Sequence, residues 1–219
     1  MVRTQFGATG EQSVLRRRLD GSYTVDEWGL DEDLVQFVSP FLAVRWQIAV
    51  DGAEELPDHG PAVLVFNRRF GISEPFVVAR GIRQAIGRYV RAAGAPDVAP
   101  VGPALRRMGA VLARPDELAG LLRADQMVAV GLRPSRRRRH HAGAPPADLL
   151  GPALAVGAPV FPVAVTGREV GRRWRLVVGP SIERPTTRGP LAAEELADRV
   201  RAGVQALLDD QYPPRLFRS

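Results

Sequence analysis

The sequence of 219 residues contains no cysteine and no lysine. The absence of cysteine excludes disulfide bonds, thiolate zinc sites and thiol nucleophiles. All 30 basic residues are therefore arginine, which together with abundant Ala, Gly, Pro and Val indicates a GC-rich genome. The number of arginines is thus weak evidence by itself, but the net charge of +6 still favours anionic partners such as phospholipid headgroups, nucleotides or nucleic acid.

Long apolar runs are also absent from the sequence. The longest uncharged run, residues 149–165, is shorter than the ~20 residues that a membrane-spanning helix needs, and three prolines interrupt it. The N-terminal stretch has no continuous apolar core after its first charge, so it does not have the pattern of a secretory signal. We expect a cytoplasmic protein that is either soluble or attached peripherally at the inner face of the plasma membrane.

Alternating strand and helix patterns predict an α/β fold. The expected strands are 47–50, 61–67, 88–91, 110–113, 127–131, 159–165 and 173–178. The expected helices are 31–46, 75–84, 102–108, 116–124, 149–156 and 191–210, with Pro40 as a kink or break in the first. This order implies a largely parallel or mixed sheet that is covered by helices on both faces.

The length and hydrophobic content fit a single domain. We divide the chain into an irregular N-terminal lead-in at 1–30, an α/β domain at 31–212 and a C-terminal tail at 213–219. The apolar residues of the first predicted helix are interpreted as core, with a membrane-facing patch as the alternative. These residues are Phe37, Phe41, Leu42 and Trp46.

The most informative segment is 62–76, AVLVFNRRFGISEPF. A short buried strand ends at Asn67, the only asparagine in the sequence, and a polar turn and a predicted helix follow. This arrangement resembles the glycerolipid acyltransferase superfamily, which includes the lysophosphatidate acyltransferases and which has a catalytic His after the Asn and an Asp five residues later. Here Arg68 stands at the His position and Ser73 at the Asp position, with Glu74 beside it.

Three further segments extend the resemblance from about Val50 to the final helix. PVGPALRRMGAVLAR resembles the second motif region, with Gly109 and Arg114 at its Gly and Arg positions. MVAVGLRP lies where the family has Phe-Pro-Glu-Gly-Thr-Arg, so Gly131 and Arg133 match while the Glu and Thr positions do not. GAPVFPVAV resembles the fourth motif, a buried strand. The resemblance implies an acyltransferase-like fold.

The replaced residues remove the chemistry that acyl transfer needs. A base must take the proton of the attacking hydroxyl, and histidine suits this role because its pKa is ~6.5. Arg68 stays protonated and Ser73 carries no charge, so neither can act in that way. The histidines are His59 in a turn and His140 and His141 in a basic loop; we interpret all three as surface residues, with a loop histidine as a substitute base the alternative.

The motif that remains is rich in positive charge. The resemblance implies that Arg133 binds the phosphate of the acceptor, and Arg68 and Arg69 would add guanidinium groups where the base used to be. Arginine binds phosphate bidentately, so a phospholipid headgroup or the phosphates of coenzyme A would fit. Internal ion pairs, for example with Glu74, are the alternative. The predicted substrate-binding residues are Arg68, Arg69, Arg114, Gly131 and Arg133.

A run of four arginines lies in the loop that follows the matched strand: Arg136, Arg137, Arg138 and Arg139. We expect this run to contact an anionic membrane surface. Nucleic acid is the less favoured partner, because the sequence has no recognition-helix signature and no aromatic platform. Neither a Walker loop nor a GxGxxG fingerprint follows a strand, so nucleotide binding by those routes is not expected.

The sequence therefore predicts a glycerolipid acyltransferase-like protein that binds a phospholipid, a lysophospholipid or acyl-CoA with little or no acyl transfer. Acyl-CoA or acyl carrier protein would be the acyl donor, and no metal or resident cofactor is expected. One alternative is an active 1-acylglycerol-3-phosphate-type acyltransferase that uses Glu74 or a loop histidine as its base. Another is a basic-loop module that binds nucleic acid or a protein.

Overall fold

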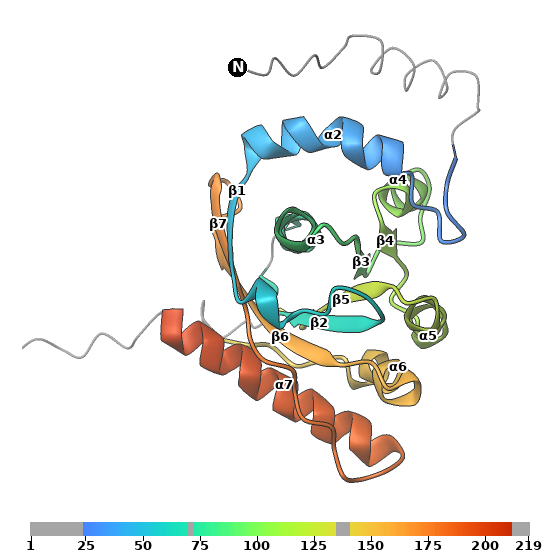
Figure 1. Cartoon of the computed structure of the whole chain (residues 1–219), viewed down its shortest axis with the longest axis vertical. Helices are drawn as coiled ribbons and strands as arrows, with labels where there is room; N and C mark the ends of the chain where they lie inside the picture. The colour runs from blue at the N-terminus through green and yellow to red at the C-terminus, as the bar shows by residue number, and fades with distance from the viewer. Residues whose placement is uncertain (1–23, 70–71, 135–140, 212–219) are drawn as a thin grey trace, which may run out of the picture.

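The structure, a computed structural model, describes residues 24–69, 72–134 and 141–211. Its strands form one sheet of seven, in the order β1-β7-β6-β2-β5-β3-β4 (Figure 1). The strands are β1 (Gln47–Asp51), β2 (Ala62–Phe66), β3 (Val90–Ala93), β4 (Ala110–Val111), β5 (Met127–Gly131), β6 (Val160–Gly167) and β7 (Arg173–Val178). The helices are α2 (Glu32–Arg45), α3 (Ser73–Ile86), α4 (Val101–Arg107), α5 (Pro115–Arg123), α6 (Ala147–Val156) and α7 (Pro190–Gln211), with a 3-10 turn at Ala53–Glu55. The predicted α/β class is confirmed.

The direction of the strands decides which strand ends, and therefore which loops, lie together on each side of the sheet. The strands β6, β2, β5, β3 and β4 are parallel to one another, whereas β7 is antiparallel to β6 and β1 is parallel to β7. The carboxyl ends of the five parallel strands therefore meet at one edge, which we call the carboxyl edge. In open α/β sheets ligands bind outside this edge. The connection from β1 to β2 lies at the opposite, amino edge.

Helices cover both faces of the sheet, as the sequence predicts (Figure 1). Successive residues of β2 point to opposite faces, so Leu64 packs in the core beneath α3, and Val65 in the core beneath α5, α6 and α7. Every residue of β2 is buried, as expected for a central parallel strand. The α2 helix lies outside α3 rather than against the sheet (Figure 1).

Most element boundaries agree with the predictions to within two residues, and β5 and β7 agree fully. The predicted strand at 88–91 is Val90–Ala93 in the structure, and just before it the Arg88 guanidinium donates hydrogen bonds to the carbonyl oxygens of Pro57 (2.8 Å) and Gly60 (2.6 Å). Of the predicted kink or break at Pro40, the break is wrong. Pro40 lies inside a continuous α2, which begins with a side-chain cap from Asp31 to the Leu34 N–H.

The interpretation of the first helix as core is correct for Trp46 and wrong for Phe41, while Phe37 and Leu42 are half-buried and Leu42 packs against the core. Trp46 is buried and stacks on Phe76, with 6.4 Å between the ring centroids, whereas Phe41 is 65% exposed. No residue of α2 is buried, since the helix packs over α3 and not on the sheet. Among the described residues, none of the helices is long and apolar enough to cross a membrane.

The ends of the chain fall mostly outside the described residues. Residues 24–30 are irregular, as expected for the lead-in, and residues 1–23 and 212–219 lie outside the described ranges. The division of the chain into lead-in, domain and tail therefore stays a prediction.

Two helical glycines should respond in opposite ways to alanine. A Cβ on Gly81 of α3 would lie 3.0 Å from Ile48 Cγ2 and closer still to the buried Leu176 side chain, whereas a Cβ on Gly151 of α6 would meet nothing within 4 Å. We expect Gly81→Ala to lower the free energy of unfolding by about 1–3 kcal/mol through overpacking. Gly151→Ala should raise it by about 0.5–1 kcal/mol through helix propensity. Urea unfolding tests both, and a stabilised Gly81→Ala protein would contradict this packing.

Candidate functional site

Asn67 fixes the start of the turn that leaves β2. Its side chain is buried, and its Nδ2 donates to the carbonyl oxygen of Val165 (2.9 Å), while its Oδ1 accepts from the Val165 N–H (2.7 Å). These two bonds continue the pairing of β2 with β6 past the last residue of β2. Asn67 therefore positions the residues that follow it and is not free to contact a ligand.

The Arg68 side chain lies across the carboxyl edge. Two glycines show where this side chain lies. A Cβ added to Gly131, at the end of β5, would lie 2.8 Å from Arg68 Cγ and closer still to Arg68 Cδ. A Cβ added to Gly94, just after β3, would lie 4.0 Å from Arg68 Nη1. The side chain thus runs from the end of β2 over β5 toward β3. Its Nε is buried and has no hydrogen-bond partner in the part of the chain that the structure describes.

Arg69 and Glu74 contact each other through the backbone and not as an ion pair. Arg69 Nη1 donates to the carbonyl oxygen of Gly167 (2.9 Å), and Glu74 Oε1 accepts from the Arg69 backbone N–H (3.2 Å). Glu74 is 2% exposed, and its Oε2 has no hydrogen-bond partner within the described ranges. The guanidinium of Arg69 holds the turn against β6. Arg68 therefore differs from Arg69, because its buried Nε has no acceptor among the described residues.

A carboxylate that the sequence did not single out occupies the start of α3. Glu169 Oε1 accepts from Ser73 Oγ (2.6 Å), from the Ser73 N–H (3.1 Å) and from the Ile72 N–H (3.3 Å). A negative charge at a helix N-terminus is favourable because it satisfies free N–H groups and opposes the helix dipole. The charge missing from Ser73 is therefore supplied by the loop between β6 and β7.

The strand pattern could have indicated Glu169. The predicted strand 159–165 and the strand before Asn67 were both expected in a largely parallel sheet, and residues that follow parallel strands meet at one edge. What the sequence could not show is that Ser73 and Glu169, 96 residues apart, form a hydrogen bond.

Two other predicted substrate-binding arginines lie at the same edge, farther along the sheet. Arg133 follows β5, is exposed, and donates its backbone N–H to Ala144 O (2.9 Å). Arg114 follows β4 and forms an exposed ion pair with Asp97 (3.1 Å). Three strand spacings of about 4.8 Å separate β2 from β4, and the Arg68 side chain spans part of that distance.

The described histidines do not lie beside Glu74. His59 precedes β2 and therefore lies at the amino edge, in agreement with its interpretation as a surface residue. His141 Nδ1 lies 2.8 Å from Gln205 Oε1 of α7, on the face of the sheet opposite to α3. His140 and Arg136 to Arg139 lie outside the described residues. The described part of the chain holds no group of three or more His, Cys, Asp or Glu residues that could bind a metal ion.

Three comparisons with known proteins were informative to different degrees, and the comparison with solved structures supports the α/β fold described above. No protein-family model matches the chain. The chain is 30% identical over 132 residues, 53% of its length, to an uncharacterized protein of Mycobacterium leprae (strain TN), and it spans about a third (35%) of that relative's length. It is similar to the crystal structure of the 1-acyl-sn-glycerophosphate (LPA) acyltransferase PlsC from Thermotoga maritima, with a TM-score of 0.55, 16% identity, and coverage of 80% of this chain and 78% of the other. The chain therefore has an acyltransferase-like fold.

Removal of the Glu169 carboxylate should destabilise the start of α3. In Glu169→Ala three donors lose their acceptor, so we expect the free energy of unfolding to fall by about 1–3 kcal/mol. Glu169→Gln keeps an oxygen acceptor and loses only the charge, which should cost about 0.3–1 kcal/mol. Chemical denaturation measures both, with Glu183→Ala, an exposed glutamate, as the matched control. Equal effects of Glu169→Ala and Glu183→Ala would contradict this assignment.

Proposed function

We propose that this protein binds a phosphate-bearing lipid, a phospholipid or lysophospholipid, or acyl-CoA at the carboxyl edge, with little or no acyl transfer. The observation that carries the proposal is the Arg68 side chain, which lies over Gly131 and whose buried Nε has no acceptor among the described residues. A buried donor without a partner costs free energy, and a phosphate oxygen would satisfy it. Arg68 also stands where the resembled enzymes have their base.

The neighbouring positive charges support a phosphate ligand. Arg133 and Arg168 follow β5 and β6 at the same edge, and both are exposed. Guanidinium groups pair bidentately with phosphate, and several of them around one edge would hold a dianionic headgroup. Gly131 contributes by its lack of a side chain, since any Cβ there would displace Arg68.

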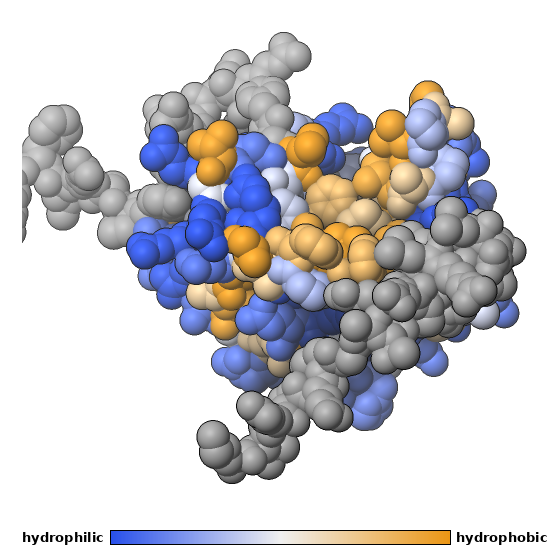
Figure 2. Space-filling model, turned by 90° about the horizontal axis from the view of Figure 1, so that it is seen from above, coloured by the Kyte–Doolittle hydropathy of each residue, from blue (hydrophilic) through white to orange (hydrophobic). Residues whose placement is uncertain are grey.

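An exposed apolar rim beside this edge supports a lipid over a soluble phosphate. The rim consists of Phe41 (65% exposed), Val44 (68%), Ile72 (75%) and Val170 (87%). Hydrogen bonds place three of its members around one junction, because Arg45 donates to the carbonyl oxygens of Glu169 and Gly171, and Glu169 accepts from the Ile72 N–H. Figure 2 looks onto the α2 side of the molecule and shows apolar side chains gathered across the middle of this face.

We infer that the rim contacts the membrane, so that a lipid headgroup reaches the arginines from the bilayer. Apolar side chains inserted at the interface and basic residues beside an anionic surface both favour such binding. This would be a peripheral attachment on the cytoplasmic side.

A second candidate function is acyl transfer with Glu74 as the base. The observation that favours it is the buried Glu74 Oε2, which has no partner in the described part of the chain and could accept a proton. Against it, the Glu74 carboxylate has no described histidine beside it, and its other oxygen is held by the Arg69 N–H.

Removal of the Arg68 guanidinium should weaken lipid binding. We expect Arg68→Gln to lower the affinity for lysophosphatidate by about 10–100-fold, which corresponds to a charge-assisted hydrogen bond of about 1.5–3 kcal/mol. Isothermal titration calorimetry with lysophosphatidate below its micellar concentration measures the change. Arg123→Gln, an exposed arginine of α5 away from the carboxyl edge, is the matched control. Equal affinities of the Arg68→Gln and Arg123→Gln proteins would overturn the proposal.

Acyl transfer should be absent from the native protein. We expect no transfer from acyl-CoA to lysophosphatidate above the uncatalysed rate, because the described site has no neutral imidazole to act as base. Turnover that is lost in Glu74→Gln would instead establish the second candidate. A restored motif needs Arg68→His and Ser73→Asp together with Glu169→Ala, since the Glu169 carboxylate would otherwise lie against the new Asp.

A further inference from the structure

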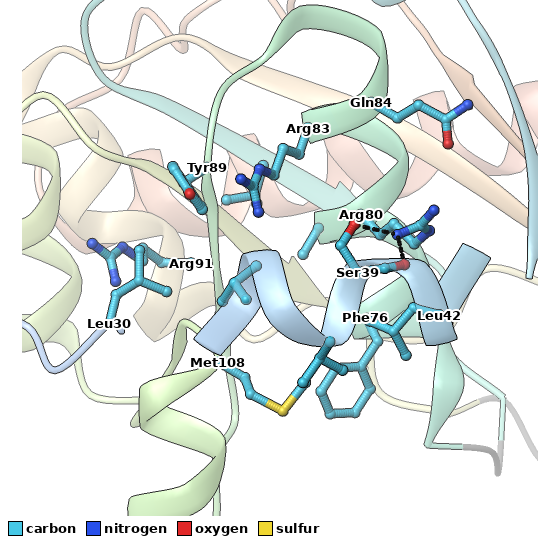
Figure 3. Close-up of a pocket in the computed structure, with 14 residues that line it drawn as sticks. Leu30, Ser39, Leu42, Phe76, Arg80, Arg83, Gln84, Tyr89, Arg91 and Met108 are labelled. Atoms are coloured by element: carbon cyan, nitrogen blue, oxygen red, sulfur yellow. Dashed lines mark hydrogen bonds between the residues drawn. The ribbon is translucent and has the colours of Figure 1, made fainter. Parts of the chain in front are cut away.

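A separate cavity of about 320 Å³ lies between α2 and α3 (Figure 3). Much of its wall is apolar, from Val38 and Leu42 of α2, Phe76 and Ala79 of α3, and Met108. Cavities of about 300–1,000 Å³ with mainly apolar walls and a few polar groups are the usual form of small-molecule sites. The α2 helix lies over the cavity, and none of its residues is buried. The side chains of α2 therefore line the cavity without filling it.

Two arginines, one turn apart on α3, line this cavity. Arg80 Nη1 donates to the backbone oxygen (3.0 Å) and to Oγ (3.0 Å) of Ser39, and Arg83 lies over the Tyr89 ring, 4.1 Å from its centroid (Figure 3). Neither forms an ion pair with a carboxylate in the described part of the chain, and Arg80 Nε is buried without a hydrogen-bond partner there.

Among the described residues, no carboxylate therefore neutralises Arg80 or Arg83 by an ion pair. Burial lowers the pKa of Arg80, and the nearby charge of Arg83 lowers it further. The carboxylates at the other end of the cavity act on different groups. Asp26 pairs with Arg91. Burial raises the pKa of Tyr89, the charge of Arg83 and its side-chain hydrogen bond to Tyr89 lower this pKa, and the charge of Glu32 raises it. Two guanidinium groups that repel each other in an apolar cavity would be stabilised by a single anion between them.

We propose that this cavity binds a single-chain aliphatic carboxylate, a free fatty acid, with its carboxylate at Arg80 and Arg83 and its chain along Val38, Leu42 and Phe76. A carboxylate offers two acceptor oxygens, which suit the unpartnered Arg80 Nε and the Arg83 guanidinium. An aliphatic chain suits the apolar wall. The proposal does not rest on the proposed function, since its arginines lie on α3 and not in the turn that holds Arg68.

The test compares two ten-carbon ligands with different headgroups, an anionic carboxylate and an uncharged hydroxyl. Calorimetry or competition with a fluorescent fatty acid measures the binding of decanoate and of 1-decanol to the full chain and to Arg80→Gln, Arg83→Gln and Arg123→Gln. We expect each of the first two substitutions to weaken decanoate binding at least tenfold and to leave 1-decanol binding unchanged, with no effect of Arg123→Gln. Thermal unfolding confirms that each variant is folded. Equal binding of decanoate and 1-decanol to the native chain would overturn the proposal.

Two further variants locate the site. Ala79→Leu fills the cavity without changing its charge, so it should weaken both ligands. If it weakens neither, the ligands bind elsewhere and the proposal is wrong. Arg68→Gln should leave decanoate binding unchanged, whatever its effect on lysophosphatidate. A loss of decanoate binding in Arg68→Gln would show that the cavity is not an independent site, and would overturn the proposal without affecting the proposed function.

Discussion

The pair of hydrogen bonds between Asn67 and Val165 is the constraint on which the carboxyl edge depends. It joins the chain that leaves β2 to β6 and so fixes where the following residues lie. Arg69 adds a bond to Gly167, and Glu169, two residues farther, caps α3. The turn, the end of β6 and the start of α3 are thereby held as one polar unit.

In the function proposed for this edge, the polar unit binds an anion and does not activate a hydroxyl group. The sequence resemblance predicts that Arg68 stands at the position of the base, and in the structure the carboxylate at the start of α3 comes from Glu169, which accepts a hydrogen bond from Ser73. A guanidinium cannot take a proton, but it can bind an anion strongly. This difference is the reason for proposing that the carboxyl edge binds an anionic ligand with little or no acyl transfer.

Much of the fold followed from the sequence, because the strands are short, apolar and separated by amphipathic helices. The predictions failed where one side chain acted over a long distance. Arg88 donates to a loop carbonyl oxygen 31 residues away, and Glu169 brings a carboxylate to Ser73 from 96 residues away. Periodicity also could not show that α2 lies over a cavity, so it assigned Phe41 to the core. These contacts join residues far apart in the chain, which no local pattern records.

The most direct test of the account is whether the Arg68 Nε–H meets a phosphate. Arginine Nε–H signals can be followed by NMR in ¹⁵N-labelled protein, and the Arg68 signal is assigned by its loss in Arg68→Gln. On titration with lysophosphatidate, the account predicts a downfield shift of this signal and its protection from exchange with solvent, as the buried donor gains an acceptor. An Arg68 signal that stays unchanged at saturating lipid would show that this guanidinium does not bind the phosphate.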